Sequence, residues 1–166
     1  MNDHEFARHL AQRAGDLLMG IRSGSDHQSP DELGRLGDVA SHDLLMMLLN
    51  EHRPHDAVLS EEGADDVRRL RSQRVWIIDP LDGTFHYARG EDDFAIHVAL
   101  WEENLGITAA SVYVPSRSHL MSMDDDITEL AAPPHMRLIV SRTRPPANME
   151  HLLESLSITT GCDVSV

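Results

Sequence analysis

The stretch over residues 76–84 constrains this chain most, because a hydrophobic run passes directly into two carboxylates, a proline and a Gly-Thr pair. The run Val75 to Ile78 predicts a buried strand. The proline and glycine that follow predict a turn as soon as that strand ends. The carboxylates of Asp79 and Asp82 are therefore expected at the mouth of a strand, outside the core.

Asp79 and Asp82 lie three residues apart across the predicted turn, so both can bend toward one cation. The carbonyl of Leu81, freed from sheet pairing, is expected to point the same way. Hard oxygen ligands of this kind suit Mg²⁺ or Mn²⁺. Behind them, the backbone N–H groups of Gly83 and Thr84 can face a phosphate oxygen, because glycine admits a close approach. The stretch thus predicts a combined metal and phosphate site.

A second apolar run, Ala57 to Leu59, also ends in acid, with Glu61 and Glu62. Two neighbouring strands that both finish in carboxylates would repel each other unless a divalent cation neutralised them. Taken alone, the two glutamates are more simply a solvated loop. Together with residues 76–84, they favour a metal site.

The remaining elements are predicted from periodicity and from breaker residues. Apolar residues at helical spacing from Phe6 to Ile21 predict a first amphipathic helix, and a second is expected over about Ser41 to Glu51. Further strands are predicted at 96–101, 108–114, 119–123 and 138–141, with a last helix at about 148–156.

Composition restricts the partners and the compartment. At 166 residues the chain can bury one core, and its net charge of −14 argues against unassisted binding of nucleic acid or an anionic membrane. Its one cysteine, Cys162, excludes an internal disulfide and fits a reducing compartment. With no signal peptide and no membrane span expected, we predict a cytoplasmic protein. The 11 histidines are scattered and are expected at the surface.

The motif from Asp79 to Thr84, with Glu61-Glu62 upstream, resembles the inositol monophosphatase superfamily of Mg²⁺-dependent, Li⁺-sensitive phosphatases. Within it, the likeness is strongest to CysQ-type phosphatases of 3′-phosphoadenosine 5′-phosphate, the bisphosphate nucleotidases. The segments that carry this likeness are residues 56–62, 94–101 and 141–146.

The resemblance implies an α+β fold, the N-terminal half of a sugar-phosphatase fold, with two helices packed on an antiparallel-rich sheet. It implies a domain over residues 1–156 that carries the metal motif. Residues 157–166 would begin a truncated C-terminal α/β domain.

The resemblance also implies roles for individual residues. The implied metal ligands are Glu61, Asp79, the Leu81 carbonyl and Asp82. The implied cradle for the substrate phosphate is Gly83 and Thr84.

Asp38 matches a family aspartate that opens the second helix, hydrogen-bonds the motif threonine and helps to activate the attacking water. Asp43 is a rival for this role but fits the spacing less well. Arg35 departs from the family pattern, which has a threonine there. On the residues alone, Asp38 can also be a plain N-cap.

The implied chemistry is in-line displacement at phosphorus by a metal-activated water. The reaction would use two or three Mg²⁺ ions, replaceable by Mn²⁺. Two of them, about 3.5–4 Å apart, would hold the attacking and leaving oxygens and lower the pKa of the water. Glu61 and Thr84 would position the water, and Asp38 would orient Thr84. Phosphatases with an aspartyl nucleophile instead use Asp-x-Asp-Gly-Thr, whose carboxylates are two residues apart, so we give that class little weight.

The substrate is expected to be a small phosphorylated metabolite. Ser141, in a segment that resembles a nucleotide-contacting one, tips the prediction toward removal of the 3′-phosphate of 3′-phosphoadenosine 5′-phosphate. Residues 85–87, Phe-His-Tyr, match neither the nucleotidase nor the inositol monophosphatase pattern. Inositol phosphates and fructose 1,6-bisphosphate therefore stay open.

An alternative is a catalytically deficient, metal-binding half-domain that acts as a pseudoenzyme or assembly partner. It is motivated by the family's second domain, which brings a further metal-binding aspartate and which this sequence does not show before Val166. Such a half would expose the apolar face that this domain normally covers, and would tend to form a homodimer.

Overall fold

The computed structural model describes residues 1–24, 29–64, 67–126, 136–141, 144–160 and 164–165. The chain forms two compact units, residues 1–126 and residues 127–166. Each unit is described by itself. The first unit contains every predicted site residue except Ser141.

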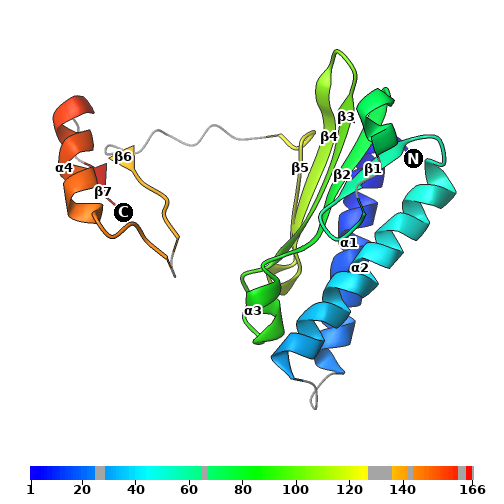
Figure 1. Cartoon of the computed structure of the whole chain (residues 1–166), viewed down its shortest axis with the longest axis horizontal. Coiled ribbons are helices and arrows are strands. Elements are labelled where there is room, and N and C mark those ends of the chain that lie inside the picture. Colours follow the sequence, from blue (N-terminus) through cyan, green and yellow to red (C-terminus); the bar gives the residue numbers. More distant parts are fainter. Residues whose placement is uncertain (25–28, 65–66, 127–135, 142–143, 161–163, 166) are drawn as a thin grey trace. The chain divides into compact units, whose positions relative to one another are not determined.

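Five strands form one sheet in the first unit, in the order β1-β2-β3-β4-β5 (Figure 1). Their bounds are β1 (Ala57–Ser60), β2 (Arg74–Asp82), β3 (Ala95–Glu102), β4 (Gly106–Val114) and β5 (His119–Ser122). The pair β1 and β2 is parallel, and the other neighbouring pairs are antiparallel. This arrangement confirms the predicted α+β class with an antiparallel-rich sheet.

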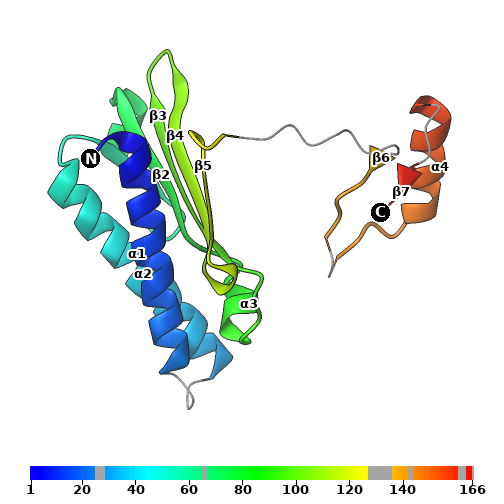
Figure 2. The same cartoon turned by 180° about the vertical axis from the view of Figure 1, so that it is seen from behind.

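Two long helices, α1 (Asp3–Ser23) and α2 (Pro30–His52), cover one face of this sheet (Figures 1 and 2). α1 packs against β3 and β4, and α2 packs against β2. The fully buried side chains of α1 include four at helical spacing: Phe6, Leu10, Ala14 and Leu18. They share one core with the fully buried Trp76 of β2. No helix within the described ranges is both long and apolar enough to cross a membrane.

Helix α2 begins at Pro30, well before the predicted start near Ser41. The start is fixed by a capping box, in which the Ser29 hydroxyl accepts a hydrogen bond from the Glu32 N–H while the Glu32 carboxylate accepts one from the Ser29 N–H. Pro30 suits the first turn because it lacks an N–H that would be unpaired there. Asp38 thus lies inside the helix, and the prediction that it opens or caps the helix is wrong.

Gly34 and Gly37 let α2 approach the short helix α3 (Thr84–Ala88) closely. A Cβ atom at Gly34 would lie 3.2 Å from Thr84 Cγ2, and one at Gly37 would lie 2.7 Å from Tyr87 Cε1. Two glycines in a helix weaken its intrinsic propensity, which is why the sequence pattern missed this part of α2. Here they allow a packing that brings α2 beside Thr84.

The remaining elements are short. In the first unit they are the 3₁₀ turns η1 (Val67–Arg71) and η2 (Pro115–Arg117). The second unit has α4 (Met149–Thr160) and a parallel pair, β6 (Met136–Arg137) and β7 (Val164–Ser165). The prediction of a strand over residues 138–141 is wrong, because β6 ends at Arg137 and Ile139 is fully exposed. The predicted domain boundary near residue 156 stays a prediction.

Replacing Gly37 by alanine should destabilise the protein. The added Cβ would lie 2.7 Å from Tyr87 Cε1 and 3.0 Å from Leu81 Cδ2. The overpacking cost of about 1–3 kcal/mol should exceed the gain of about 1 kcal/mol in helix propensity. Urea unfolding measures the difference.

Gly20→Ala is the matched control in α1. Gly20 is exposed, and a Cβ there would meet nothing within 4 Å. This variant should therefore gain up to about 1 kcal/mol of stability. Equal stabilisation by both substitutions would contradict the close packing of α2 on α3.

Candidate active site

The ends of the parallel strands β1 and β2 bring two predicted ligands together. Ser60, the last residue of β1, is in register with Ile78, so the next residues along each strand are Glu61 and Asp79. The N–H of Glu61 donates to the carbonyl of Ile78 at 3.4 Å. The carboxyls of Glu61 and Asp79 lie close enough to share a hydrogen bond.

A β-bulge brings Asp82 to the same face of the sheet as Asp79. In a regular strand, residues three apart point to opposite faces. The register with β3 shifts between these two residues, because Asp79 pairs with His97 but Asp82 pairs with Ala95. Ala95 and His97 are two apart and share one face, so their partners share it too. The prediction that the strand ends at Ile78 and the chain then turns is wrong, since β2 continues to Asp82.

The turn comes at Gly83, which starts α3 in a left-handed conformation with φ of 87°. A Cβ at this position would lie 2.6 Å from the carbonyl oxygen of Asp93. Both the positive φ and the close approach require glycine. The N–H groups of His86 and Tyr87 donate to the Gly83 carbonyl and so close the first turn of α3.

Thr84 and Asp38 form the hydrogen bond that the family resemblance implied. Thr84 Oγ1 lies 3.0 Å from Asp38 Oδ1 and 3.1 Å from the Leu81 carbonyl oxygen. A hydroxyl has one proton, so it donates to one of these acceptors at a time. When it donates to Asp38, it does not donate to the Leu81 carbonyl. Asp43, the rival candidate, is an exposed residue further along α2.

Helix α2 also holds the two strand ends. The buried Ser41 hydroxyl donates to the carbonyl of Pro80, inside the bulge, at 2.7 Å. The next residue of the helix contacts the other strand end, because His42 Nδ1 lies 2.8 Å from Ser60 Oγ, at the end of β1. One rigid helix thus fixes the positions of both strand ends relative to Thr84.

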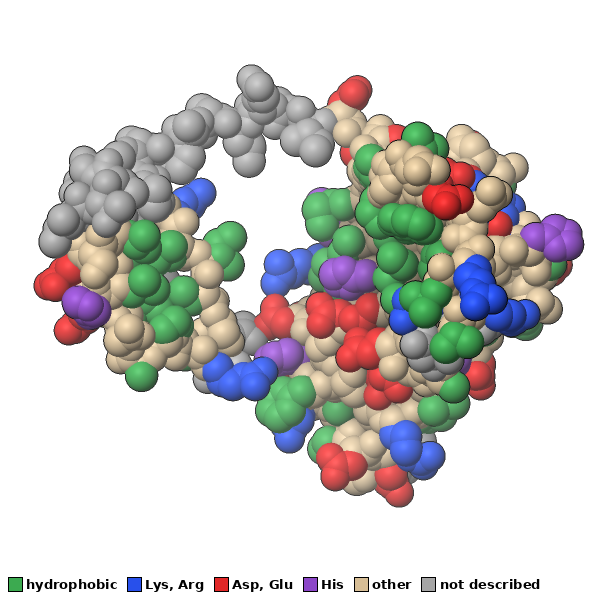
Figure 3. Space-filling view, turned by 45° about the horizontal axis from the view of Figure 1, so that its top comes forward, with side chains coloured by type: hydrophobic (Ala, Val, Ile, Leu, Met, Phe, Trp, Pro, Cys, Tyr) green, Lys and Arg blue, Asp and Glu red, His purple; other side chains and the backbone are tan. Residues whose placement is uncertain are grey.

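Burial and neighbouring carboxyls disfavour the ionisation of Asp79 and Asp38. Burial raises the pKa of Asp79 to about 7, and the charge and hydrogen bond of Glu61 and the charge of Asp82 act in the same direction. Burial also raises the pKa of Asp38, with smaller contributions from the charges of Glu62 and Glu61, while its bond from Thr84 opposes the rise. A divalent cation would relieve this repulsion. Figure 3 shows acidic side chains gathered on a face of the first unit, next to a hydrophobic area.

The oxygen donors at the strand ends fit a hard cation such as Mg²⁺. They are the carboxylates of Glu61, Asp79 and Asp82 and the carbonyl of Leu81, and hard oxygen ligands are those that Mg²⁺ prefers. The Asp79 carboxylate is also oriented, because its Oδ1 accepts the N–H of Leu81 at 3.2 Å.

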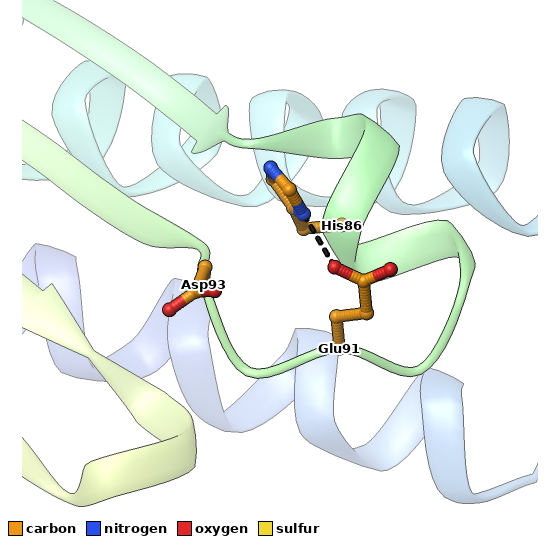
Figure 4. A group of neighbouring side chains, drawn as sticks. All are labelled: His86, Glu91 and Asp93. Atoms are coloured by element: carbon orange, nitrogen blue, oxygen red, sulfur yellow. Dashed lines mark hydrogen bonds and ion pairs between the residues drawn. The ribbon is translucent and has the colours of Figure 1, made fainter. Parts of the chain in front are cut away.

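Another group of side chains that could hold a metal ion, which the sequence did not indicate, lies between α3 and β3: His86, Glu91 and Asp93 (Figure 4). One donor atom from each lies within 4.8 Å of the others, and His86 Nδ1 is 2.6 Å from Glu91 Oε2. Arginine side chains already contact this loop. Arg117 Nη2 lies 3.3 Å from Asp93 Oδ1, and Arg22 Nη1 donates to the Glu91 carbonyl. Because one of its donors is an imidazole, Mg²⁺ fits the strand-end oxygens better.

Ser141 belongs to the second unit, where it is exposed and its hydroxyl accepts a hydrogen bond from the Arg144 N–H at 3.1 Å. Its predicted contact with a nucleotide stays a prediction. The roles of the other predicted site residues are likewise predictions, although the structure brings them together in the first unit.

Asp79→Asn should make the metal-free protein more stable at high pH. The pKa of Asp79 is raised to about 7 in the folded protein, so between about pH 4 and 7 the folded state binds more protons than the unfolded state. The free energy of unfolding therefore falls as pH rises through this window. Asparagine removes that loss. We therefore expect the stability of the variant relative to wild type to increase between pH 5 and pH 8, measured by thermal unfolding in EDTA.

Asp124→Asn is the control of opposite sign. Its hydrogen bonds with Ser122 and then Arg8 lower the pKa of Asp124 to about 2. This contribution is already complete at pH 5, so the variant should lose stability at both pH values. If the effect of Asp79→Asn did not change between pH 5 and pH 8, the described crowding of carboxyls would be wrong.

Comparison with known proteins identifies the family. The inositol monophosphatase family model matches residues 3–155. A 3′-phosphoadenosine 5′-phosphate phosphatase of Mycobacterium bovis is 44% identical over 154 residues, which cover 87% of this chain and 58% of that protein. The protein of the same name from Mycobacterium leprae is 40% identical over 171 residues. This alignment covers 95% of this chain and 63% of that protein. The chain thus spans about three fifths of the length of these curated relatives.

Solved structures agree on the fold. CysQ from Bacteroides thetaiotaomicron has a TM-score of 0.74 at 24% identity, over 96% of this chain and 70% of that one. Inositol monophosphatase II from Staphylococcus aureus has a TM-score of 0.76 at 21% identity, over 100% and 65%. The family match over residues 3–155 and the identity to the mycobacterial proteins show that this chain belongs to the inositol monophosphatase family.

Proposed function

We propose that this protein is a Mg²⁺-dependent phosphomonoesterase that removes the 3′-phosphate of 3′-phosphoadenosine 5′-phosphate. The observation that carries the proposal is the bulge that puts Asp79 and Asp82 on one face beside Glu61. The substrate class is supported by the names of the mycobacterial relatives. The proposal includes two or three Mg²⁺ ions, replaceable by Mn²⁺, sensitivity to Li⁺ and a cytoplasmic location.

The proposed metal ligands are Glu61, Asp79, the Leu81 carbonyl and Asp82. Divalent ions bound there would lower the pKa of a water and neutralise charge on the phosphoryl oxygens. The carbonyl is available for this when the Thr84 hydroxyl donates to Asp38.

The attacking water would be placed by Glu61 and Thr84. When the Thr84 hydroxyl donates its proton to Asp38, an oxygen lone pair can accept a hydrogen bond from the water. Asp38 thereby fixes the direction of that lone pair. The substrate phosphate would rest on the N–H groups of Gly83 and Thr84, where the left-handed glycine turns the chain.

Phosphate release from 3′-phosphoadenosine 5′-phosphate tests this function. We expect release with Mg²⁺ and none with EDTA. Thr84→Val keeps the side-chain shape but removes the hydroxyl, so kcat should fall about 100-fold, as is usual for loss of a group that handles a proton. Thr84→Ser keeps the hydroxyl and should stay within a few-fold of wild type.

Inositol 1-phosphate and fructose 1,6-bisphosphate serve as competing substrates in the same assay. Faster release from either would move the proposal to that substrate. A chain that binds Mg²⁺ but releases no phosphate from any of the three would instead be a metal-binding assembly partner. Equal rates for Thr84→Val and Thr84→Ser would contradict the role given to the Thr84–Asp38 bond.

A further inference from the structure

His97 projects from β3 on the face of the sheet that bears the proposed metal ligands. Its neighbours along the strand, Ile96 and Val98, are buried in the core under the helices. Successive side chains of a strand alternate between faces, so His97 lies on the opposite face. Its cross-strand partner there is Asp79.

The imidazole of His97 also reaches Asp82. Nε2 of His97 lies 3.4 Å from Asp82 Oδ2. The register shift explains this contact, because it sets Asp82 opposite Ala95, one step of the same face away from His97. One imidazole thus has Asp79 directly across from it and Asp82 on the diagonal.

The same histidine lines a groove of about 510 Å³ together with Glu61 and Asp79. Most of the groove is made of the apolar sheet face, including Ile77 and Ala99. The two acidic side chains that line it, Glu61 and Asp79, belong to the proposed metal site, and His97 lines the groove with them. This placement puts the imidazole at the edge of the proposed metal site.

We propose that His97 is a positioning residue for the metal site, whose Nε2–H holds Oδ2 of Asp82 and fixes that carboxylate for a cation. The inference rests on the proposed function, because it takes Asp82 as a metal ligand. An Nε2–H exists both in the protonated ring and in one neutral tautomer, so the role needs no change of protonation. The contact is made through Oδ2, and Oδ1 of the same carboxylate can face the cation.

A partner such as His97 matters for Asp82 because packing restrains this side chain little. The Asp82 side chain is 61% exposed, so little packing restrains its rotamers. A cation would have to order the carboxylate on binding unless a neighbour already held it. Hydrogen-bond partners of metal ligands typically contribute 10–100-fold to metal affinity. Because this contact is long and His97 is itself 47% exposed, we expect the lower end, about tenfold.

The inference can be tested by titrating the full chain with Mn²⁺ alone and measuring the free ion by electron paramagnetic resonance. His97→Ala should weaken Mn²⁺ binding about tenfold. His97→Gln keeps an N–H donor and should restore most of the affinity. The control His119→Ala removes an exposed histidine from β5, the strand at the far edge of the sheet, and should bind Mn²⁺ as wild type does.

Two further readouts separate the possible failures. Thermal unfolding in EDTA should be the same for His97→Ala and wild type, because the exposed imidazole is not part of the core. Asp79→Asn should abolish Mn²⁺ binding if the proposed metal site exists. If His97→Ala binds Mn²⁺ with wild-type affinity while Asp79→Asn loses Mn²⁺ binding, the role of His97 is overturned and the metal site stands. Unchanged binding in Asp79→Asn would overturn the metal site and this inference together.

Discussion

The carboxyls of Glu61 and Asp79 are crowded together at the ends of two parallel strands, with Asp82 on the same face of the sheet. Burial, reinforced by the nearby carboxyls of Glu61 and Asp82, raises the pKa of Asp79 to about 7. The fold holds these carboxyls together. The register of β1 on β2 places Glu61 beside Asp79, and the bulge in β2 turns Asp82 to the same face. An arrangement that costs folding free energy at neutral pH is typical of a functional site.

The rest of the first unit supports this concentration of charge. Helix α2 contacts both strand ends and Thr84, through Ser41, His42 and Asp38. It can do so because Gly34 and Gly37 leave room for α3. The helix is anchored in turn by a core that includes fully buried residues of α1 and β2. Packing, rather than the site residues themselves, therefore sets the distance between Asp38 and Thr84.

Much of this could be predicted from the sequence. The apolar runs before Asp79 and before Glu61 are local patterns, and each predicted a strand that the structure contains. The short helix α3 after Gly83 was not predicted. The start of α2 was missed because two glycines argue against a helix until their contacts with Thr84 and Tyr87 are known. The capping box of Ser29 and Glu32 was a readable signal for the true start.

Other features depend on the pairing of strands and could not be read along the chain. The bulge that sets Asp82 beside Asp79 appears only in the register with β3. His97 could have been placed on the outer face from the alternation of Ile96, His97 and Val98, but its approach to Asp82 follows from the bulge. The loop group of His86, Glu91 and Asp93 likewise needs the chain to fold back on α3.

A crystal structure of the protein grown with Mn²⁺, with the anomalous signal of the ion recorded, would show whether a cation binds at the strand ends. We expect an ion within about 2 Å of carboxylate oxygens of Glu61 and Asp79 and of the Leu81 carbonyl oxygen. An ion bound only by His86, Glu91 and Asp93, with none at the strand ends, would contradict this expectation.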